Sequence, residues 1–214
     1  WLPQLTAYTH DGWDTRPIPS TGEHKFYEPA LFHVALDLPA DITVATTGVE
    51  IDTQHIGENR TQHRFVASDA REFAVHFSNR YRIHELGGDP DASTTRVRVF
   101  YDHTASKAEE GELAARRVAL HATKALAFFD DWLGPTPLAE LDLVLSTGNF
   151  AMGTEYPGLV TLNLNVIDGF GSDPGLTVAH EVAHQWWYSE VGNDSIAEPW
   201  VDEALTSYSA ARYW

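Results

Sequence analysis

TVAHEVAHQWWYSEVGNDSIAEPWVDEA, residues 177–204, is the stretch that decides the fold, because its pattern predicts helices on both sides of a turn. The start of the first helix is marked by Ser172 or Asp173 as a cap and by Pro174 in the first turn. The apolar pattern of this helix continues through Trp187. Glycine, asparagine and aspartate residues then allow the chain to reverse, so the two helices are expected to lie side by side.

Two histidines of the first helix are spaced for binding one metal ion. His180 and His184 are one turn apart, so both imidazoles lie on one face and can reach an ion at about 2.0 to 2.1 Å. Glu203 is the candidate third ligand, because it comes directly after the eighteen residues, 185–202, that follow His184, on a second helix that begins near Pro199. Two imidazoles and one carboxylate leave an open coordination position, as a catalytic zinc site requires.

Glu181 is the candidate general base. It is rotated by roughly 100 degrees from His180 around the helix, so it reaches a water at the metal more easily than the metal itself. A carboxylate in that place can accept the water's proton. The alternative is a helix that is merely rich in histidine and glutamate, since His-Glu-x-x-His arises by chance in roughly one such sequence in thirty. The helical context and the downstream carboxylate favour the metal site.

The composition excludes several classes of site and partner. The 14 basic and 31 acidic residues give a formal net charge of -17, which argues against nucleic acid and against an anionic membrane surface as partners. Because the chain has no cysteine, a metal has to be held by histidine and carboxylate. No apolar run approaches the roughly 20 residues of a transmembrane helix. The negative charge and the lack of cysteine favour an exported or cell-surface location.

The chain divides into a β-rich first part and a mixed second part, so the expected fold class is α+β. Residues 1–93 contain short alternating apolar runs broken by turn formers, which predict antiparallel strands, and residues 87–93 are the expected linker. In the second part, apolar residues at three-and-four spacing predict a long helix over residues 107–133. Residues 140–148 and 158–168 are expected to form strands.

Three segments together resemble the gluzincin zinc aminopeptidases, the family that includes membrane alanyl aminopeptidase and leukotriene hydrolase. They are HEVAHQWW, EPWVDEALTSY and, upstream, FAMGTEYPGLV. The family signature is His-Glu-x-x-His, eighteen residues and then Glu. The resemblance implies that His180, His184 and Glu203 bind one Zn²⁺ per chain and that Glu181 is the catalytic base.

The upstream segment adds residues that would bind substrate. By the resemblance, Glu155 binds the free α-amino group of a peptide, and a carboxylate near the metal would pair with an ammonium. Gly153 would let the substrate backbone approach closely. Thr154 stands where the family usually has methionine, a departure that affects the expected shape of the pocket for the first side chain. The expected substrates are peptides with a free N-terminus.

The resemblance also implies a domain organisation. Residues 94–214 would be the front part of a thermolysin-like catalytic domain, and residues 1–93 the end of a β-rich N-terminal domain. The chain is expected to be a truncated fragment, because Trp1 follows no leader and the last residues read as a helix. The tyrosine that stabilises the oxyanion in the family is expected after Trp214, so the fragment alone would bind metal and hydrolyse poorly.

Two alternatives to an aminopeptidase stay open at this point. A zinc endopeptidase would use the same metal site without needing Glu155. A non-catalytic interaction module would retain the peptidase fold with a vestigial site.

A further expectation concerns four tryptophans that recur at helical spacing and are expected to bury the back of the two helices; they are Trp186, Trp187, Trp200 and Trp214.

Overall fold

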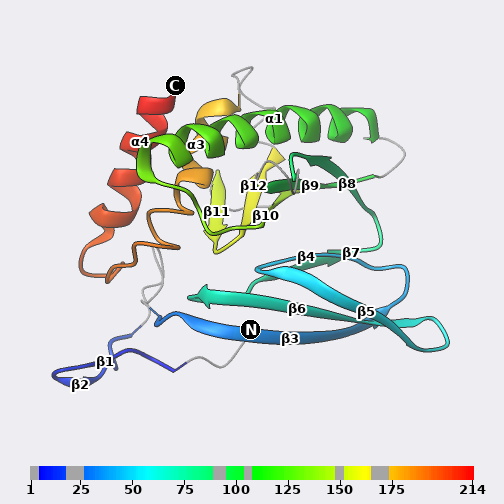
Figure 1. The fold of residues 1–214 in the computed structure, drawn as a ribbon, viewed down its shortest axis with the longest axis horizontal. Coiled ribbons are helices and arrows are strands. Elements are labelled where there is room, and N and C mark those ends of the chain that lie inside the picture. The colour runs from blue at the N-terminus through cyan, green and yellow to red at the C-terminus, as the bar shows by residue number, and fades with distance from the viewer. Residues whose placement is uncertain (1–4, 18–26, 89–94, 104–107, 148–151, 165–173) are drawn as a thin grey trace.

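The computed structural model describes residues 5–17, 27–88, 95–103, 108–147, 152–164 and 174–214. These residues form an α+β structure with three layers (Figure 1). A five-stranded sheet lies in the middle, with a long helix on one face and a β-rich part on the other.

The β-rich part contains antiparallel pairs of strands. A three-stranded sheet has the order β3-β6-β5, and two-stranded sheets pair β4 with β7 and β1 with β2. The three-stranded sheet buries one face, on which Phe65 and Ala67 of β6 pack with Phe73, which follows that strand, at the centre of a small core. The strands of this part are β1 (Tyr8–Thr9), β2 (Gly12–Trp13), β3 (Ala30–Pro39), β4 (Thr43–Thr46), β5 (Val49–Gly57), β6 (Arg60–Ala70) and β7 (Val75–Ser78).

The five-stranded sheet has the order β11-β12-β10-β9-β8. Its three central strands are parallel, and the two outer strands, β8 and β11, run antiparallel to their neighbours. The expected domain boundary after Ser93 falls between β8 and β9, which pair with each other, so strands from both sides of that boundary form one sheet. The strands of the five-stranded sheet are β8 (Tyr81–Leu86), β9 (Arg96–Asp102), β10 (Glu140–Ser146), β11 (Gly153–Tyr156) and β12 (Leu159–Asn163).

The alternation of side chains along the central strands explains the three layers. Successive residues of a strand point to opposite faces. Val99, Leu143 and Val160 therefore face the large core under the helices, whereas Phe100 and Val144 face the β-rich part. Both faces are apolar because both are covered, which is typical of parallel strands.

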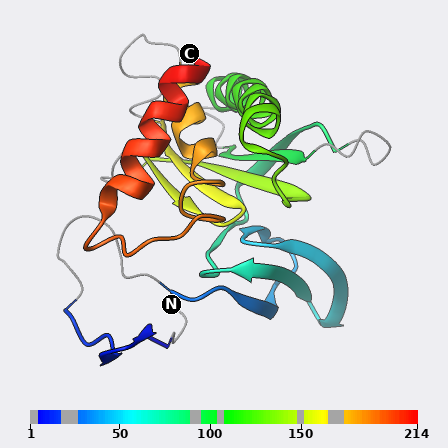
Figure 2. The ribbon, with the colours of Figure 1, turned by 60° about the vertical axis from the view of Figure 1, so that its left-hand side comes forward.

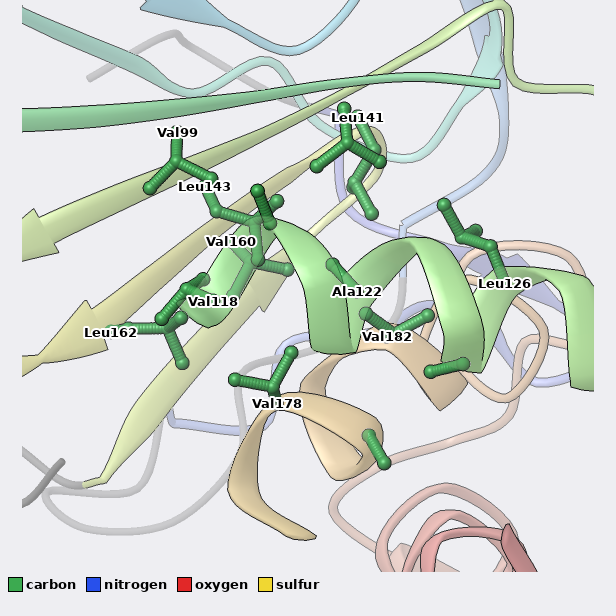
Figure 3. Packing of buried hydrophobic residues seen from close by; sticks show 14 of the residues in the cluster. Val99, Val118, Ala122, Leu126, Leu141, Leu143, Val160, Leu162, Val178 and Val182 are labelled. Atoms are coloured by element: carbon green, nitrogen blue, oxygen red, sulfur yellow. The ribbon is translucent and has the colours of Figure 1, made fainter. Parts of the chain in front are cut away.

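The long helix α1 (Ala108–Leu133) confirms the helix expected over residues 107–133, of which Lys107 lies outside the described residues. In Figure 2 it is seen nearly end-on above the sheet, with α4 (Leu205–Tyr213) beside it. Its buried stripe follows helical spacing and packs on the sheet and on α3 (Gly175–Ala183). Figure 3 shows this contact through Val118, Ala122, Leu126, Val178 and Val182.

The prediction that the helix carrying His180 continues through Trp187 is wrong. Helix α3 ends at Ala183, with Pro174 before its first residue and His184 as its C-cap. The chain then forms a compact turn in which the Val191 N–H donates to the carbonyl of Trp186. The expected caps Ser172 and Asp173 lie outside the described residues. The two expected strands are present but shorter, as β10 and β12, and residues 165–168 also lie outside the described part.

The expectation that all four tryptophans are packed is wrong for two of them. Trp186 is buried, and its indole N–H donates to the carbonyl of Gly134 at 2.9 Å. Trp187 packs against the core and donates to Ser209 Oγ at 2.9 Å. Trp200, the first residue of η1 (Trp200–Ala204), and Trp214, which follows α4, are 59% and 62% exposed, and of Trp214 only the ring edge lies against Gly175 of α3. Among the described helices, none combines the length and the apolar character needed to cross a membrane.

Candidate metal centre

Helix α3 brings the two histidines together, as their spacing predicts. The ring centroids of His180 and His184 are 4.9 Å apart, and the rings are nearly perpendicular at 83°. Their Nε2 atoms are 3.2 Å from each other. His184 is the C-cap of α3 and still has helical backbone angles. Its ring therefore lies one helical turn from that of His180, on the same face.

Glu203 reaches the same point from the second helical segment. Its Oε2 atom lies 3.3 Å from His180 Nε2, and one ligand atom each of His180, His184 and Glu203 lies within 4.8 Å of the others. Glu203 belongs to η1, a single π-helical turn that continues directly into α4. π-helical turns are rare and are frequently found at functional sites, which makes the presence of one at this point informative.

Two of the three separations between the candidate ligand atoms are those of a tetrahedral zinc ion. Ligands about 2.05 Å from a tetrahedral centre are separated from one another by about 3.3 Å. The separations found here, 3.2 Å between the two Nε2 atoms and 3.3 Å from His180 Nε2 to Glu203 Oε2, match that value. Two imidazoles and one carboxylate are also a donor set that zinc accepts with one position left open.

Asp202 holds the ring of His184 in place. Its side chain is fully buried, and its Oδ1 atom lies 2.7 Å from His184 Nδ1. The Nδ1–H group therefore donates to a carboxylate, and the Nε2 atom is left facing His180. Burial alone lowers the pKa of His184, but the hydrogen bond with Asp202 and the charge of Glu155 outweigh burial and raise that pKa to about 9. Asp202 was not identified from the sequence, although an acidic residue directly before Glu203 was the available signal.

Glu181 lies beside the two histidines and packs against the sheet edge. Its side chain is buried, and its carboxyl group fills the space next to Gly153, so that an added Cβ at Gly153 would collide with it. Gly153 thus has a structural role at this point, since any larger residue would push the Glu181 carboxylate away. A contact of Gly153 with the backbone of a substrate stays a prediction.

Glu155 approaches the site from strand β11. One oxygen each of Glu155 and Glu181 lies within 4.8 Å of a ring nitrogen of His184 and within 4.8 Å of each other. Glu155 is half-buried, as is its neighbour Thr154. Six residues therefore surround one small space: five come from α3, its C-cap and η1, and Glu155 comes from the edge strand β11. All six except Asp202 were singled out from the sequence.

Tyr188, in the turn after His184, contacts an acidic residue of the β-rich part, and sequence reasoning missed this contact. Its backbone has a φ of 110°, which non-glycine residues rarely adopt, and its carbonyl accepts a hydrogen bond from Arg71 Nε at 2.9 Å. The phenol donates to Glu72 of the β-rich part. Burial, then the charges of Glu72 and Glu155, raise the pKa of Tyr188 well above its usual value, so the phenol stays neutral. The field around this side of the site is negative.

Comparisons with known proteins give partial and distant similarities. No family model matches the chain. Over 83 residues, or 38% of its length, the chain is 26% identical to Aminopeptidase O of Homo sapiens and to Aminopeptidase O of Mus musculus. Over 124 residues, or 53% of its length, it is 33% identical to Aminopeptidase M1-B of Oryza sativa subsp. japonica. The matches span only 10% and 13% of those proteins, and they support a relationship to aminopeptidases.

Proposed function

We propose that the protein carrying this chain is a zinc-dependent aminopeptidase that removes N-terminal residues from peptides. The observation that carries the proposal is the convergence of ligand atoms from His180, His184 and Glu203 within 4.8 Å of one another, with Glu181 and Glu155 beside them. The partial similarity to aminopeptidases agrees with it. In this proposal, residues 94–214 are the front part of a thermolysin-like catalytic domain that follows the end of a β-rich domain, residues 1–93.

His180, His184 and Glu203 would hold the zinc ion, with Asp202 keeping the Nδ1–H tautomer of His184. When bound, zinc supplies a Lewis acid that polarises a carbonyl and lowers the pKa of water toward neutrality. Asp202 strengthens His184 as a ligand, because a carboxylate that accepts the Nδ1 proton makes the opposite nitrogen more electron-rich.

Glu181 would move the proton during hydrolysis. As a carboxylate it accepts a proton from the attacking water while the water oxygen bonds to the peptide carbonyl carbon. It then returns that proton to the leaving amine as the carbon–nitrogen bond breaks, so the products are a free amino acid and a shortened peptide. The packing of Glu181 against Gly153 holds the carboxylate in one place for both transfers.

Glu155 would select substrates with a free amino terminus. An ammonium group pairs well with a carboxylate in a partly buried site, and the negative field from Glu72 and Glu155 favours a cation there. Because Glu155 lies close to Glu181 and His184, an ammonium bound to it would place the first peptide bond of the substrate near the metal ligands. This arrangement supports removal of single residues from the chain end.

The metal site is tested by zinc analysis of the purified protein and of two variants. We expect one zinc per chain, lost in His184→Ala and retained in Glu181→Gln. Hydrolysis by Glu181→Gln should fall by about a hundredfold to ten-thousandfold, because proton transfer is removed while the metal stays. Absence of zinc under replete conditions would instead support a non-catalytic module, and full turnover by Glu181→Gln would remove Glu181 as the base.

Glu155→Ala tests the exopeptidase assignment. We expect kcat/KM for amino acid amides with a free amino group to fall by at least about tenfold, because an ammonium loses its charged partner. Glu58→Ala, at an exposed turn far from the site, is the matched control and should leave kcat/KM unchanged. Equal activity of the unaltered protein on amino-blocked peptides would show an endopeptidase.

A further inference from the structure

Gln185, the residue that follows the second histidine, connects the metal-binding helix to the hairpin that carries Glu155. Its side chain is completely buried. The Oε1 atom accepts a hydrogen bond from the Gly158 N–H at 2.8 Å, and the Nε2 group donates to the Tyr156 carbonyl at 3.1 Å. One side-chain amide therefore contacts the backbone on both sides of Pro157.

The β11–β12 turn needs a partner of this kind. Tyr156 and Leu159 are paired across the two strands, so Pro157 and Gly158 form a two-residue turn, and Gly158 has the positive φ of 70° that such a turn requires. The N–H of the second turn residue points away from the hairpin, and a buried N–H group requires a hydrogen-bond acceptor. Glutamine offers an acceptor and a donor in one planar group, which matches the N–H and the carbonyl on either side of the proline.

A second contact fixes the position of β11 relative to α3. At the start of β11, Gly153 packs directly on the Glu181 carboxyl group. Glu181 lies in the last turn of α3, and Gln185 lies in the turn that follows directly, where its N–H donates to the Val182 carbonyl. Strand β11 is thus held at Gly153 by Glu181 and at its far end by Gln185, and Glu155 lies between these two points.

We propose that Gln185 is a positioning residue that sets the distance between Glu155 and the metal ligands. This inference rests on the proposed function and deepens it, because that distance decides how far from a free amino terminus the peptide is cut. Gln185 does not touch substrate or metal; it acts by holding the β11–β12 turn. Loss of its two hydrogen bonds frees the turn, and Glu155 then no longer presents its carboxylate at one fixed place.

The first test measures hydrogen exchange at the turn in the metal-free protein, which requires no activity. Gln185→Met keeps the length of the side chain and removes both hydrogen bonds. We expect the Gly158 amide to exchange about tenfold faster or more in this variant, while the amides of α1 keep their protection. Gln185→Glu retains an acceptor for the Gly158 N–H and should keep that amide protected. The matched control, Gln54→Met on the exposed strand β5, should leave exchange unchanged.

The second test compares substrates with free and blocked amino groups. In Gln185→Met we expect full zinc content, a KM for free amino acid amides raised about tenfold, and a kcat for them within about threefold of that of the unaltered protein. The preference for free over blocked substrates should fall. An unchanged KM for free amides, or a loss of protection spread equally over α1 and the turn, would overturn the positioning role.

Failure of the two proposals can be told apart. If the unaltered protein binds no zinc or cleaves no peptide, the proposed function fails, and the exchange experiment still decides whether Gln185 holds the turn. If the unaltered protein is an aminopeptidase and Gln185→Met has the same KM and the same exchange at Gly158, only the positioning role fails.

Discussion

Asp202 and Glu203 show how two neighbouring carboxylates acquire different roles at the residue scale. Asp202 is fully buried and lies 2.7 Å from His184 Nδ1, so it can act only through the histidine. Glu203 is half-buried, and its Oε2 atom faces His180 Nε2. Consecutive residues of a regular α-helix point about 100 degrees apart. The π-helical turn that contains both residues widens the helix at this point and presents both carboxylates to the histidine pair.

Asp202→Ala should weaken zinc binding by about tenfold to a hundredfold, because His184 loses the group that orients its ring. Asp202→Asn keeps an acceptor for the Nδ1–H group and should lose less affinity. Titration of the metal-free protein with zinc in competition with a chelator measures both values. Equal affinity of the alanine variant and the unaltered protein would show that the remaining contacts of His184, with Thr206 and with the Trp187 carbonyl, are sufficient.

At the scale of elements, the small residues of α1 decide how closely α3, the helix that carries His180, packs. Ala115, Ala119 and Ala122 are completely buried in the core between α1, the sheet and α3. Val178 and Val182 of α3 lie in the same core (Figure 3). Alanine side chains allow the two helices to approach closely, and this approach fixes the position of α3 and therefore of His180.

Ala122→Leu should destabilise the protein by about 1–3 kcal/mol, because the close-packed core has no room for three additional carbon atoms. Leu120→Ala is the control, since Leu120 is on the exposed side of α1, and it should change the free energy of unfolding by less than about 0.5 kcal/mol. Urea unfolding followed by circular dichroism measures both. A stability of Ala122→Leu equal to that of the unaltered protein would contradict the close packing of α1 on α3.

At the scale of the whole molecule, the β-rich part and the five-stranded sheet are joined by polar and apolar contacts. Ala45 of β4 lies in a buried cluster with Phe100 and Val144 of the sheet. The buried Asp142 accepts a hydrogen bond from the Thr46 N–H at 3.1 Å and pairs with Arg98. The β-rich part is therefore packed against the sheet, and through Arg71 it also supports the turn after His184.

His76 makes part of this contact sensitive to pH. The ring lies on β7, its Nε2 atom is 3.0 Å from Thr161 Oγ1 of β12, and burial lowers its pKa below the usual 6.5. The unfolded chain therefore takes up a proton at a higher pH than the folded protein does. Stability from the neutral ring is present above about pH 6.5 and is lost as the pH falls below that value.

The free energy of unfolding should fall less steeply between about pH 7 and pH 5 in His76→Gln than in the unaltered protein, because glutamine keeps a polar contact with Thr161 and does not titrate. Urea unfolding at several pH values gives the two slopes. His55→Gln, on the exposed strand β5, is the control and should keep the slope of the unaltered protein. Identical slopes for His76→Gln and the unaltered protein would show that His76 contributes nothing to the pH dependence.

The sequence by itself determined the features that depend on local geometry. A helical period over residues 107–133 predicted α1 almost to the residue, and the four-residue spacing of His180 and His184 placed both rings on one face. Alternating apolar runs predicted antiparallel strands in the first part of the chain. These properties follow from the helical and strand periods of side-chain direction. Each period involves residues close together in the chain, so it is visible as a pattern in the sequence.

Only the tertiary structure decided the contacts between segments that lie far apart in the chain. The end of α3 at Ala183, the bond of Asp202 to His184 and the packing of Gly153 on Glu181 each depend on which elements meet. The pairing of β8 with β9 and the contact of Tyr188 with Glu72 depend on the order of strands and on the packing of the two parts. A periodic pattern within one segment cannot predict these contacts. They form when apolar faces of distant segments are buried against each other, which also places the polar residues beside those faces close together.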